Sequence, residues 1–329
     1  MNQHFLQSPA WEKYEQLEGC QTFRLDEKDF SALAILHSTP LGNYLYCPYG
    51  PTLKIAKNPE NTLKIALSSL SALAHEQNAF FVRIEPTFPL SASTAKSLHL
   101  YKSHDLDPAH TWVIDLTQSR EDILKQMRAS SVQYWRSSTK KGLQIRQTKD
   151  PEEISILTSL LQAVGEKDNF QPQTESHLKN QLKSDFATLY IAEFTPENPT
   201  DSKTPNTKTP VNPTKIPLAA SLVYDDTTTR FYAHAATSNE YRKINAGIVI
   251  LIQMILDAKD HGQKTFDFWG ITTSKDPKHP WYGFTKFKKS FGGHQVNYGG
   301  TWDLPLSPIK YRFYQIIRQA NRLKRKLLH

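Results

Sequence analysis

Cysteine is scarce in this chain of 329 residues, which contains only Cys20 and Cys47. Two cysteines give neither a disulfide framework nor the paired spacing of a zinc site. Long apolar runs are missing too: the longest, AGIVILIQMILDA from Ala246, is too short to cross a bilayer and predicts a buried helix. The first residues, MNQHFLQSPAWEKYEQ, contain no apolar signal-peptide core. We therefore expect a cytoplasmic protein, with peripheral contact to the inner face of the membrane left open.

The motifs of several common enzyme classes are also absent. The sequence has no Gly-x-Gly-x-x-Gly after a strand, no P-loop, no Gly-x-Ser-x-Gly elbow and no His-Glu-x-x-His. Its 12 histidines are scattered along the chain. A hydrolase with a nucleophilic triad and a zinc enzyme are therefore unsupported, and no metal is expected.

The chain has enough apolar residues for a core and carries an excess of positive charge. Hydrophobic residues make up 38% of the sequence and aromatic residues 11%, with a net charge of +8 and a pI near 9.2. The charge favours a polyanionic partner, such as nucleic acid, a phosphate-bearing substrate or an anionic membrane surface. A merely soluble basic protein fits these numbers equally well.

Two parts of the chain repeat the order strand, helix, strand. The first consists of residues 43–53, a helix over 59–77 capped by Asn58, and the strand AFFVRIEP. The second consists of RFYAHAAT, an apolar helix over 244–259, and KTFDFWGI. The repeat predicts two related α/β domains, each with a mixed sheet covered by helices.

Residues 195–217 differ in composition from the rest of the chain. They are rich in Pro, Thr, Lys and Asn, and both flanks, ATLYIAEF and PLAASLVY, look like strands. This composition predicts a disordered insertion in a hairpin connection.

The chain ends on a predicted helix that starts at Ser307 and Pro308. An apolar stripe formed by Ile309, Phe313, Ile316, Ala320, Leu323 and Leu327 is expected to dock on a domain or a partner. The other faces carry Lys310, Arg312, Arg318, Arg322, Lys324, Arg325 and Lys326, which either contact phosphates or form a solvated face.

A weak anion-binding pattern begins the second apolar helix. The stretch YRKINAG places Arg242 and Lys243 before the helix N-terminus, where backbone N–H groups favour anions. It is a degenerate form of the Arg-x-x-Gly-x-Gly turn with which GNAT acetyltransferases hold the CoA pyrophosphate, with Asn245 in place of the first glycine. A plain helix start explains the pattern equally well.

The segment KTFDFWGI followed by YGFTKFKKSFGGHQVNYGGTWDLPLSP resembles the C-terminal signature of the Fem (FemABX) family. These aminoacyl-tRNA-dependent transferases build peptidoglycan interpeptide bridges. The stretches FLQSPAWEKY, YLYCPYGPTL, VRIEP, WVIDLTQSREDILKQM and RFYAHAAT agree with the family in the same order, so the resemblance covers nearly the whole chain.

The resemblance implies an α/β fold of two tandem GNAT-like domains. Residues 1–110 with 299–329 would form domain 1, which binds the acceptor precursor and is closed by the C-terminal helix. Residues 111–298 would form domain 2. Because 152–185 show no sustained heptads, the chain resembles the armless FemX-like type, and a monomer is expected.

The implied reaction moves an amino acid from aminoacyl-tRNA to the side-chain amine of the stem peptide of UDP-MurNAc-pentapeptide or lipid II. No cofactor is implied besides the aminoacyl-tRNA co-substrate. Phe287 and Lys288 match the family's catalytic Phe–Lys pair, and Lys288 would stabilise the oxyanion or the departing ribose oxygen. The implied substrate-binding residues are Lys13, Phe80, Arg83, Glu85, Arg230 and Tyr232. Residues assigned to tRNA binding are Arg318, Arg322, Lys324, Arg325 and Lys326.

Alternatives remain at each level. Lys286, Lys288 and Lys289 also fit an exposed face of a strand in which the neighbouring aromatic side chains are packed. Arg83 and Glu85 share a strand face and also fit a plain ion pair. For the whole chain, the alternatives are a CoA-dependent N-acyltransferase and a non-catalytic protein that binds tRNA.

Overall fold

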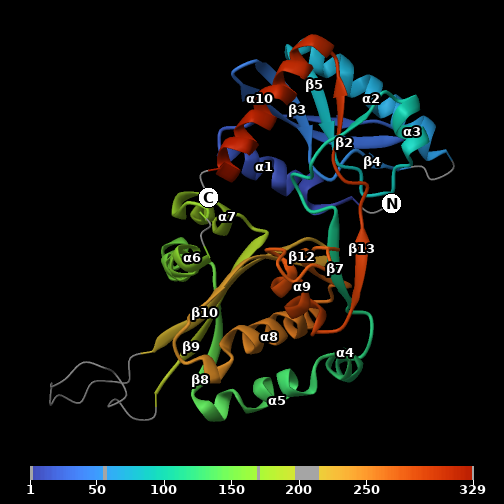
Figure 1. Ribbon diagram of the computed structural model, residues 1–329. Helices are drawn as coiled ribbons and strands as arrows, with labels where there is room; N and C mark the ends of the chain where they lie inside the picture. Colours follow the sequence, from blue (N-terminus) through green and yellow to red (C-terminus); the bar gives the residue numbers. More distant parts are fainter. Residues whose placement is uncertain (1–2, 55–57, 169–170, 197–214, 328–329) are drawn as a thin grey trace. The chain divides into compact units, whose positions relative to one another are not determined.

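A computed structural model describes residues 3–54, 58–168, 171–196 and 215–327, with the backbone alone for 167, 168 and 321–327. The chain divides into two compact units. Unit 1 consists of Met1–Ala109 and Asn297–His329, and unit 2 of His110–Val296. Each unit is described by itself (Figure 1).

Unit 1 contains a mixed sheet with the strand order β1–β2–β3–β5–β14–β6, in which β4 pairs with β2. The strands are β1 (Gln21–Asp26), β2 (Phe30–Thr39), β3 (Gly42–Cys47), β4 (Thr52–Leu53), β5 (Ala79–Ile84), β6 (Tyr101–Lys102) and β14 (Trp302–Pro305). The helices are α1 (Pro9–Leu17), α2 (Pro59–Glu76), α3 (Ala92–Ser97) and α10 (Pro308–Leu327), and Phe5–Gln7 form a 3-10 turn.

The first predicted strand–helix–strand unit is present as β3, α2 and β5. Asn58 caps α2 by accepting a hydrogen bond from the Asn61 backbone N–H at 3.2 Å, and Pro59 occupies the first turn, where no N–H is needed. Leu63 and Leu70 on one face of α2 are fully buried in the core that includes Val82 of β5. The helix thereby connects two strands that pair in parallel.

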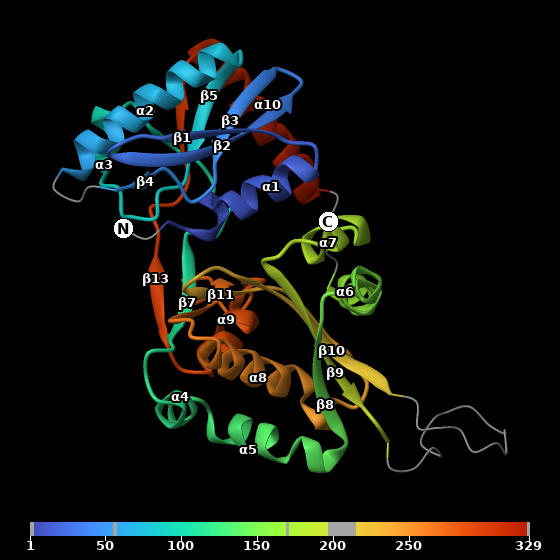
Figure 2. The same cartoon turned by 180° about the vertical axis from the view of Figure 1, so that it is seen from behind.

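Unit 2 contains a second sheet, with the order β13–β7–β12–β11–β10–β9–β8. The strands are β7 (His110–Asp115), β8 (Leu143–Thr148), β9 (Ala187–Phe194), β10 (Ile216–Asp225), β11 (Thr229–Thr237), β12 (Thr265–Gly270) and β13 (His294–Asn297). The helices are α4 (Arg120–Gln126), α5 (Ala129–Ser137), α6 (Ile154–Asp168), α7 (Glu175–Leu182), α8 (Ala246–Asp260) and α9 (Tyr282–Lys289), with 3-10 turns at Thr139–Lys141, Pro151–Glu153 and Arg242–Ile244. Helices α8 and α6 cover opposite faces of this sheet (Figures 1 and 2).

The second predicted unit is present as β11, α8 and β12, and again the two strands pair in parallel. Helix α8 is apolar on almost every side, and nine of its residues are buried, as expected for the longest apolar run of the sequence. It begins at Ala246 instead of Ile244, because Arg242–Ile244 form a 3-10 turn that ends on left-handed Asn245. The strand–helix–strand repeat predicted from the sequence is confirmed.

Three other expectations concern connections. The predicted insertion 195–217 is too long at its end, since Ile216 and Pro217 already belong to β10; residues 197–214 lie outside the described residues. Within the described parts of 152–185, α6 and α7 have 15 and 8 residues and form no coiled-coil arm, as predicted. Over the same described chain, no helix combines the length and the apolar character needed to cross a membrane.

Candidate functional site

Lys288 lies on helix α9 and not on a strand, so the strand reading of this segment is wrong. Phe284, Phe287 and Phe291 follow one another at spacings of four or three residues, which places them near one side of a helix instead of alternating across a sheet. Phe291 is fully buried in the unit 2 core and contacts Phe287, with ring centroids 5.1 Å apart. Phe287 and Phe291 therefore fix the position of α9, whereas Phe284 is exposed.

The glycine pair after α9 makes a sharp turn. Gly292 and Gly293 have φ values of 81° and 87°, in the left-handed region that favours glycine. A Cβ atom on Gly293 would lie 2.1 Å from the Val113 carbonyl oxygen, so a larger residue does not fit. The turn brings the chain from α9 directly back to β13, which lies beside β7.

The ammonium group of Lys288 is held at the end of β12. Its Nζ donates a hydrogen bond of 2.6 Å to the Gly270 carbonyl oxygen, and the side chain is half-buried. Burial lowers the pKa of Lys288 to about 8, and the negative charge of nearby Asp267 opposes this shift. Lys288 is thus a cation that loses its proton just above neutral pH.

Asp267 is the buried carboxyl group that accompanies this lysine. Its Oδ1 accepts hydrogen bonds from the Trp269 backbone N–H at 2.7 Å and from the Thr111 hydroxyl. Burial raises the pKa of Asp267 to about 6, whereas these two hydrogen bonds and Lys288 lower it. Trp269 has a φ of 63°, which is unusual for a bulky residue, and the Gly270 carbonyl that receives Lys288 follows directly after it.

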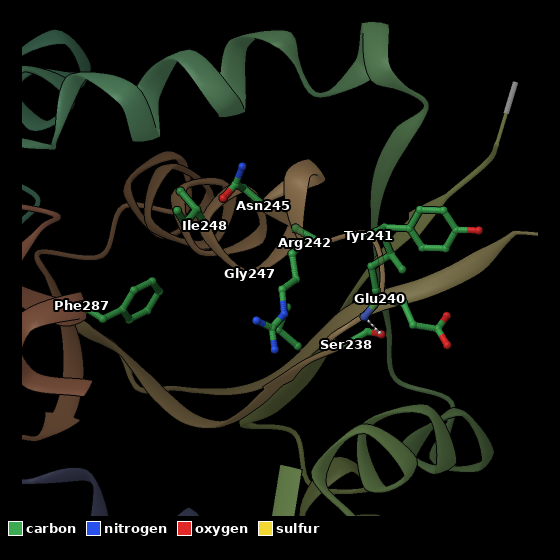
Figure 3. A pocket seen from close by; sticks show the side chains of 11 residues that line it. Ser238, Glu240, Tyr241, Arg242, Asn245, Gly247, Ile248 and Phe287 are labelled. Carbon is green, nitrogen blue, oxygen red and sulfur yellow. Dashed lines mark hydrogen bonds between the residues drawn. The ribbon is translucent and has the colours of Figure 1, made fainter. Parts of the chain in front are cut away.

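Phe287, the neighbour of Lys288, lines a hollow of about 210 Å³ in unit 2. Figure 3 shows the Arg242 side chain extending between Phe287 on one side and Ser238 on the other. The remaining lining residues come from β10, the end of β11, the connection that follows it and the first turn of α8: Leu218, Thr237, Glu240, Tyr241, Asn245, Ala246, Gly247 and Ile248. The predicted anion turn and the predicted catalytic segment therefore contribute to one pocket.

Asn245 preserves the backbone geometry of the turn despite replacing glycine. Its φ and ψ are 57° and 38°, and asparagine adopts this left-handed conformation more readily than most other residues. Gly247 must stay small, because a Cβ there would meet the Thr237 Oγ1 atom at 2.5 Å. No side chain caps the first turn of α8, and Ala246, Gly247 and Ile248 of this turn line the pocket. The missing first glycine is thus a weak argument against an anion site.

In unit 1, Glu85 is the centre of a buried hydrogen-bond cluster. Its Oε1 accepts hydrogen bonds from the backbone N–H groups of Leu106 and Asp107, at 3.1 and 3.2 Å, and from the Thr301 hydroxyl. Its Oε2 lies 2.6 Å from the Tyr46 hydroxyl oxygen, which is also 2.6 Å from Asp107 Oδ2. Glu85 is 2% exposed, so the cluster as a whole determines its charge.

The cluster has more acceptors than protons when both carboxyl groups are ionised. The Tyr46 hydroxyl has one hydrogen and can donate to only one of the two carboxylates. Burial raises the pKa of Asp107 to about 7 with help from the Glu85 charge, and burial likewise raises the pKa of Glu85. The raised pKa values of Glu85 and Asp107 favour one proton shared within this buried cluster.

Arg83 points to a different partner than the sequence suggested. Its guanidinium makes two hydrogen bonds to Asp303, at 2.7 and 2.8 Å, and both side chains are 1% exposed. The proposed Arg83–Glu85 pair is wrong, because β14 places Asp303 directly across from Arg83. Phe80 is buried in a cluster with Phe81 and Tyr311, and its carbonyl oxygen accepts the backbone N–H groups that lead into α10. The geometry of Arg83 and Phe80 supports structural roles, and substrate contacts by either residue stay predictions.

The other predicted substrate residues are dispersed. Arg230 is buried in unit 2 and bonded to Asp225 through two hydrogen bonds of 2.7 Å, and to the Tyr190 hydroxyl. Tyr232 is half-buried beside Phe266 and Phe268, and burial raises its pKa. Lys13 is exposed on α1 of unit 1. Their roles in binding stay predictions.

The predicted tRNA-binding residues lie along α10. Arg318 is partly exposed, and its guanidinium carbon is 5.8 Å from the centre of the Tyr314 ring. The side chains of Arg322, Lys324, Arg325 and Lys326 lie outside the described residues, although their backbone belongs to α10.

Sequence reasoning missed Tyr46, Asp107, Thr301 and Asp267. Tyr46 belongs to a predicted strand, Asp107 lies in a connection without any motif, and Thr301 lies in the quoted C-terminal signature without being singled out. Asp267, within the quoted segment KTFDFWGI, was the only acidic residue in an apolar strand, and that was the available signal.

The comparison with protein families decides the affiliation of the chain. The FemAB family matches residues 1–106 and 192–319, which is more than half of the chain. The chain belongs to the FemAB family. The resemblance inferred from the sequence motifs is confirmed.

Individual relatives have low sequence identity to this chain but match it along nearly their whole length. A lipid II:glycine glycyltransferase of Staphylococcus epidermidis is 19% identical over 382 residues, covering 96% of this chain and 91% of the relative. The aminoacyltransferase FemA of the same species is 20% identical over 411 residues, covering 98% and 95%.

Solved structures confirm the fold. The crystal structure of FemX superposes with a TM-score of 0.80 at 18% identity, covering 96% of this chain and 95% of FemX. A tandem GNAT protein from the clavulanic acid biosynthesis pathway superposes with a TM-score of 0.50 at 10% identity, covering 85% and 80%. The predicted fold of two tandem GNAT-like domains is thereby confirmed.

Proposed function

We propose that this FemAB family member transfers an amino acid from aminoacyl-tRNA to an amine on the stem peptide of a peptidoglycan precursor. The comparisons support the transferase class, because the relatives are named a glycyltransferase and an aminoacyltransferase and match nearly end to end. The acceptor is UDP-MurNAc-pentapeptide or lipid II, the aminoacyl-tRNA is the co-substrate, and no further cofactor takes part. The protein acts as a monomer on the cytoplasmic side of the membrane.

The half-buried Lys288 ammonium is the observation that carries this proposal. Its pKa of about 8 keeps it mostly charged at neutral pH, and Gly270 uses one of its three N–H groups. A cation held in a partly dry site stabilises developing negative charge more strongly than one in water. Aminolysis of an ester needs such a group at the carbonyl oxygen.

The reaction balances with two proton movements. The amine nitrogen bonds to the ester carbonyl carbon, and the carbonyl oxygen becomes an oxyanion that accepts a hydrogen bond from Lys288. Collapse of this intermediate breaks the bond to the ribose oxygen, which takes a proton and leaves with the tRNA. The attacking nitrogen releases its proton to solvent, and the ribose oxygen takes one up, so that atoms and charge balance.

The test uses the purified full-length chain and identifies products by mass. Each reaction contains a mixture of aminoacyl-tRNAs and one acceptor. The acceptor is UDP-MurNAc-pentapeptide in one reaction and lipid II in the other. The expected product is the precursor plus one or more aminoacyl residues, which also identifies the donor. Absence of a product with both acceptors and every aminoacyl-tRNA would overturn the proposal.

A CoA-dependent N-acyltransferase is the second candidate, because of the pocket at the start of α8. Arg242 and the uncapped first turn of α8 line a hollow that an anionic group could enter. This candidate predicts an acylated product from acetyl-CoA without tRNA, which the same mass measurement detects. A non-catalytic tRNA-binding protein, the third reading, would yield neither product.

A further inference from the structure

Helix α10 contacts the rest of unit 1 through one narrow face. Tyr311 is 4% exposed, and its hydroxyl donates a 2.7 Å hydrogen bond to Asp303 Oδ2. The Tyr314 ring lies 5.1 Å from that of Phe81, and Arg318 lies over Tyr314. Figures 1 and 2 show α10 along the side of this unit. Aromatic side chains thus dock the helix.

Among the side chains that the structure describes, the predicted apolar stripe of α10 does not dock on unit 1. Ile309, Phe313 and Ile316 are 72%, 57% and 61% exposed, and Ile317 beside them is 47% exposed. With 100° between successive residues, these side chains project to the side of the helix roughly opposite Tyr311, Tyr314 and Arg318. For these residues, docking on the chain's own domain is wrong, and docking on a partner stays a prediction. The term outer face is used below for Ile309, Phe313, Ile316 and Ile317.

The charged residues of α10 have a single sign. Residues 308–327 include seven Lys and Arg side chains and neither Asp nor Glu. Lys310 and Arg312 are exposed within the same turns as Ile309 and Phe313. An exposed apolar stripe flanked by cations is the pattern of a helix that lies in the interface of an anionic membrane.

We propose that the outer face of α10 docks on an anionic lipid bilayer. The apolar side chains would enter the boundary between headgroups and acyl chains, and the flanking Lys and Arg side chains would contact anionic headgroups. Nucleic acid accounts for the cations but offers no apolar layer for Ile309 and Ile316. A second copy offers an apolar stripe but would bring two all-basic helices together. The inference is independent of the proposed transferase activity.

The test is flotation of the full-length protein with vesicles. One set consists of phosphatidylcholine alone, and the other contains about a third phosphatidylglycerol. We expect binding to the anionic vesicles that weakens as salt rises, and at least about tenfold weaker binding to the neutral ones. Replacement of Phe313→Glu and Ile316→Glu together should abolish binding, while the fold is retained because both side chains are exposed.

Matched variants separate the contribution of the apolar side chains from that of the flanking cations. Ile65→Glu changes an isoleucine of α2 that is 42% exposed, and it should bind vesicles like the unchanged protein. Lys310→Gln with Arg312→Gln should weaken binding and reduce its salt dependence.

Three results would overturn the proposal. The first is equal binding to neutral and anionic vesicles, and the second is unchanged binding by the Phe313→Glu, Ile316→Glu variant. The third is a loss of dimer or of tRNA binding in this variant, measured by sedimentation or filter binding, without any vesicle binding by the unchanged protein. That result would assign the outer face to a second copy or to nucleic acid.

Discussion

Arg83 of β5 and Asp303 of β14 form a buried pair with two hydrogen bonds, although 220 residues separate them in the sequence. The Tyr311 hydroxyl donates to the same carboxylate, which ties α10 to the pair. The pair thus joins the returning C-terminal segment to the strand that leads into Glu85. The pair is therefore a structural element of unit 1. Arg83 lies close in the chain to Glu85, one of the predicted substrate-binding residues.

Removal of Asp303 should strongly destabilise unit 1. Asp303→Ala leaves the Arg83 cation buried without its carboxylate, which costs about 3–5 kcal/mol of the free energy of unfolding. Asp26→Ala is the matched control, because Asp26 is paired with Lys54 but its side chain is 71% exposed, and such pairs contribute about 0–1 kcal/mol. Urea unfolding measures both. Similar losses in the two variants would contradict the structural role.

Lys288→Ala should nearly abolish transfer. Loss of one group that stabilises an oxyanion lowers kcat by about 100- to 1000-fold, with a small effect on KM. Lys286→Ala is the control, since Lys286 is an exposed lysine of the same helix. A Lys288→Ala variant that folds and turns over within a fewfold of the unchanged enzyme would remove Lys288 from the mechanism.

The pH dependence of kcat should report the Lys288 ammonium. The group must be protonated to act, and its pKa is lowered to about 8, so activity should fall as pH rises through about 8. Asp267→Asn removes the charge that opposes this shift but keeps an Oδ1 atom for Thr111 and Trp269. The alkaline limb should therefore move to lower pH in this variant. A limb that stays in place would show that another group titrates there.

The shared proton of Glu85 and Asp107 should make unit 1 less stable as pH rises. The pKa of Asp107 is raised from 3.8 to about 7, so the protonated form favours the folded state. Its contribution is fully present below about pH 4 and is lost as pH rises through 7. Asp107→Asn should flatten the pH dependence of the thermal unfolding midpoint between pH 4 and 7. Parallel curves for the variant and the unchanged protein would contradict a shared proton.

The strand–helix–strand repeat could be predicted because it depends on local patterns. Asn58 and Pro59 start α2 through their own caps and dihedral angles, and the apolar residues of α2 and α8 determine that both helices are buried. The motif around Phe287 and Lys288 identified the family for the same reason, since it is contiguous in the chain. The helix in this motif could not be predicted in the same way, because lysines next to aromatic residues suggest the alternating faces of a strand.

Contacts between segments that are distant in the chain decided the features that local patterns do not predict. The sequence by itself determined the family, the repeated α/β units and the choice of Lys288 among three lysines as the candidate. Only the tertiary structure decided that Arg83 pairs with Asp303, that Tyr46 joins Glu85 to Asp107, and that the apolar stripe of α10 faces outward. Strand register and packing between distant segments select these partners, and no local periodicity encodes them.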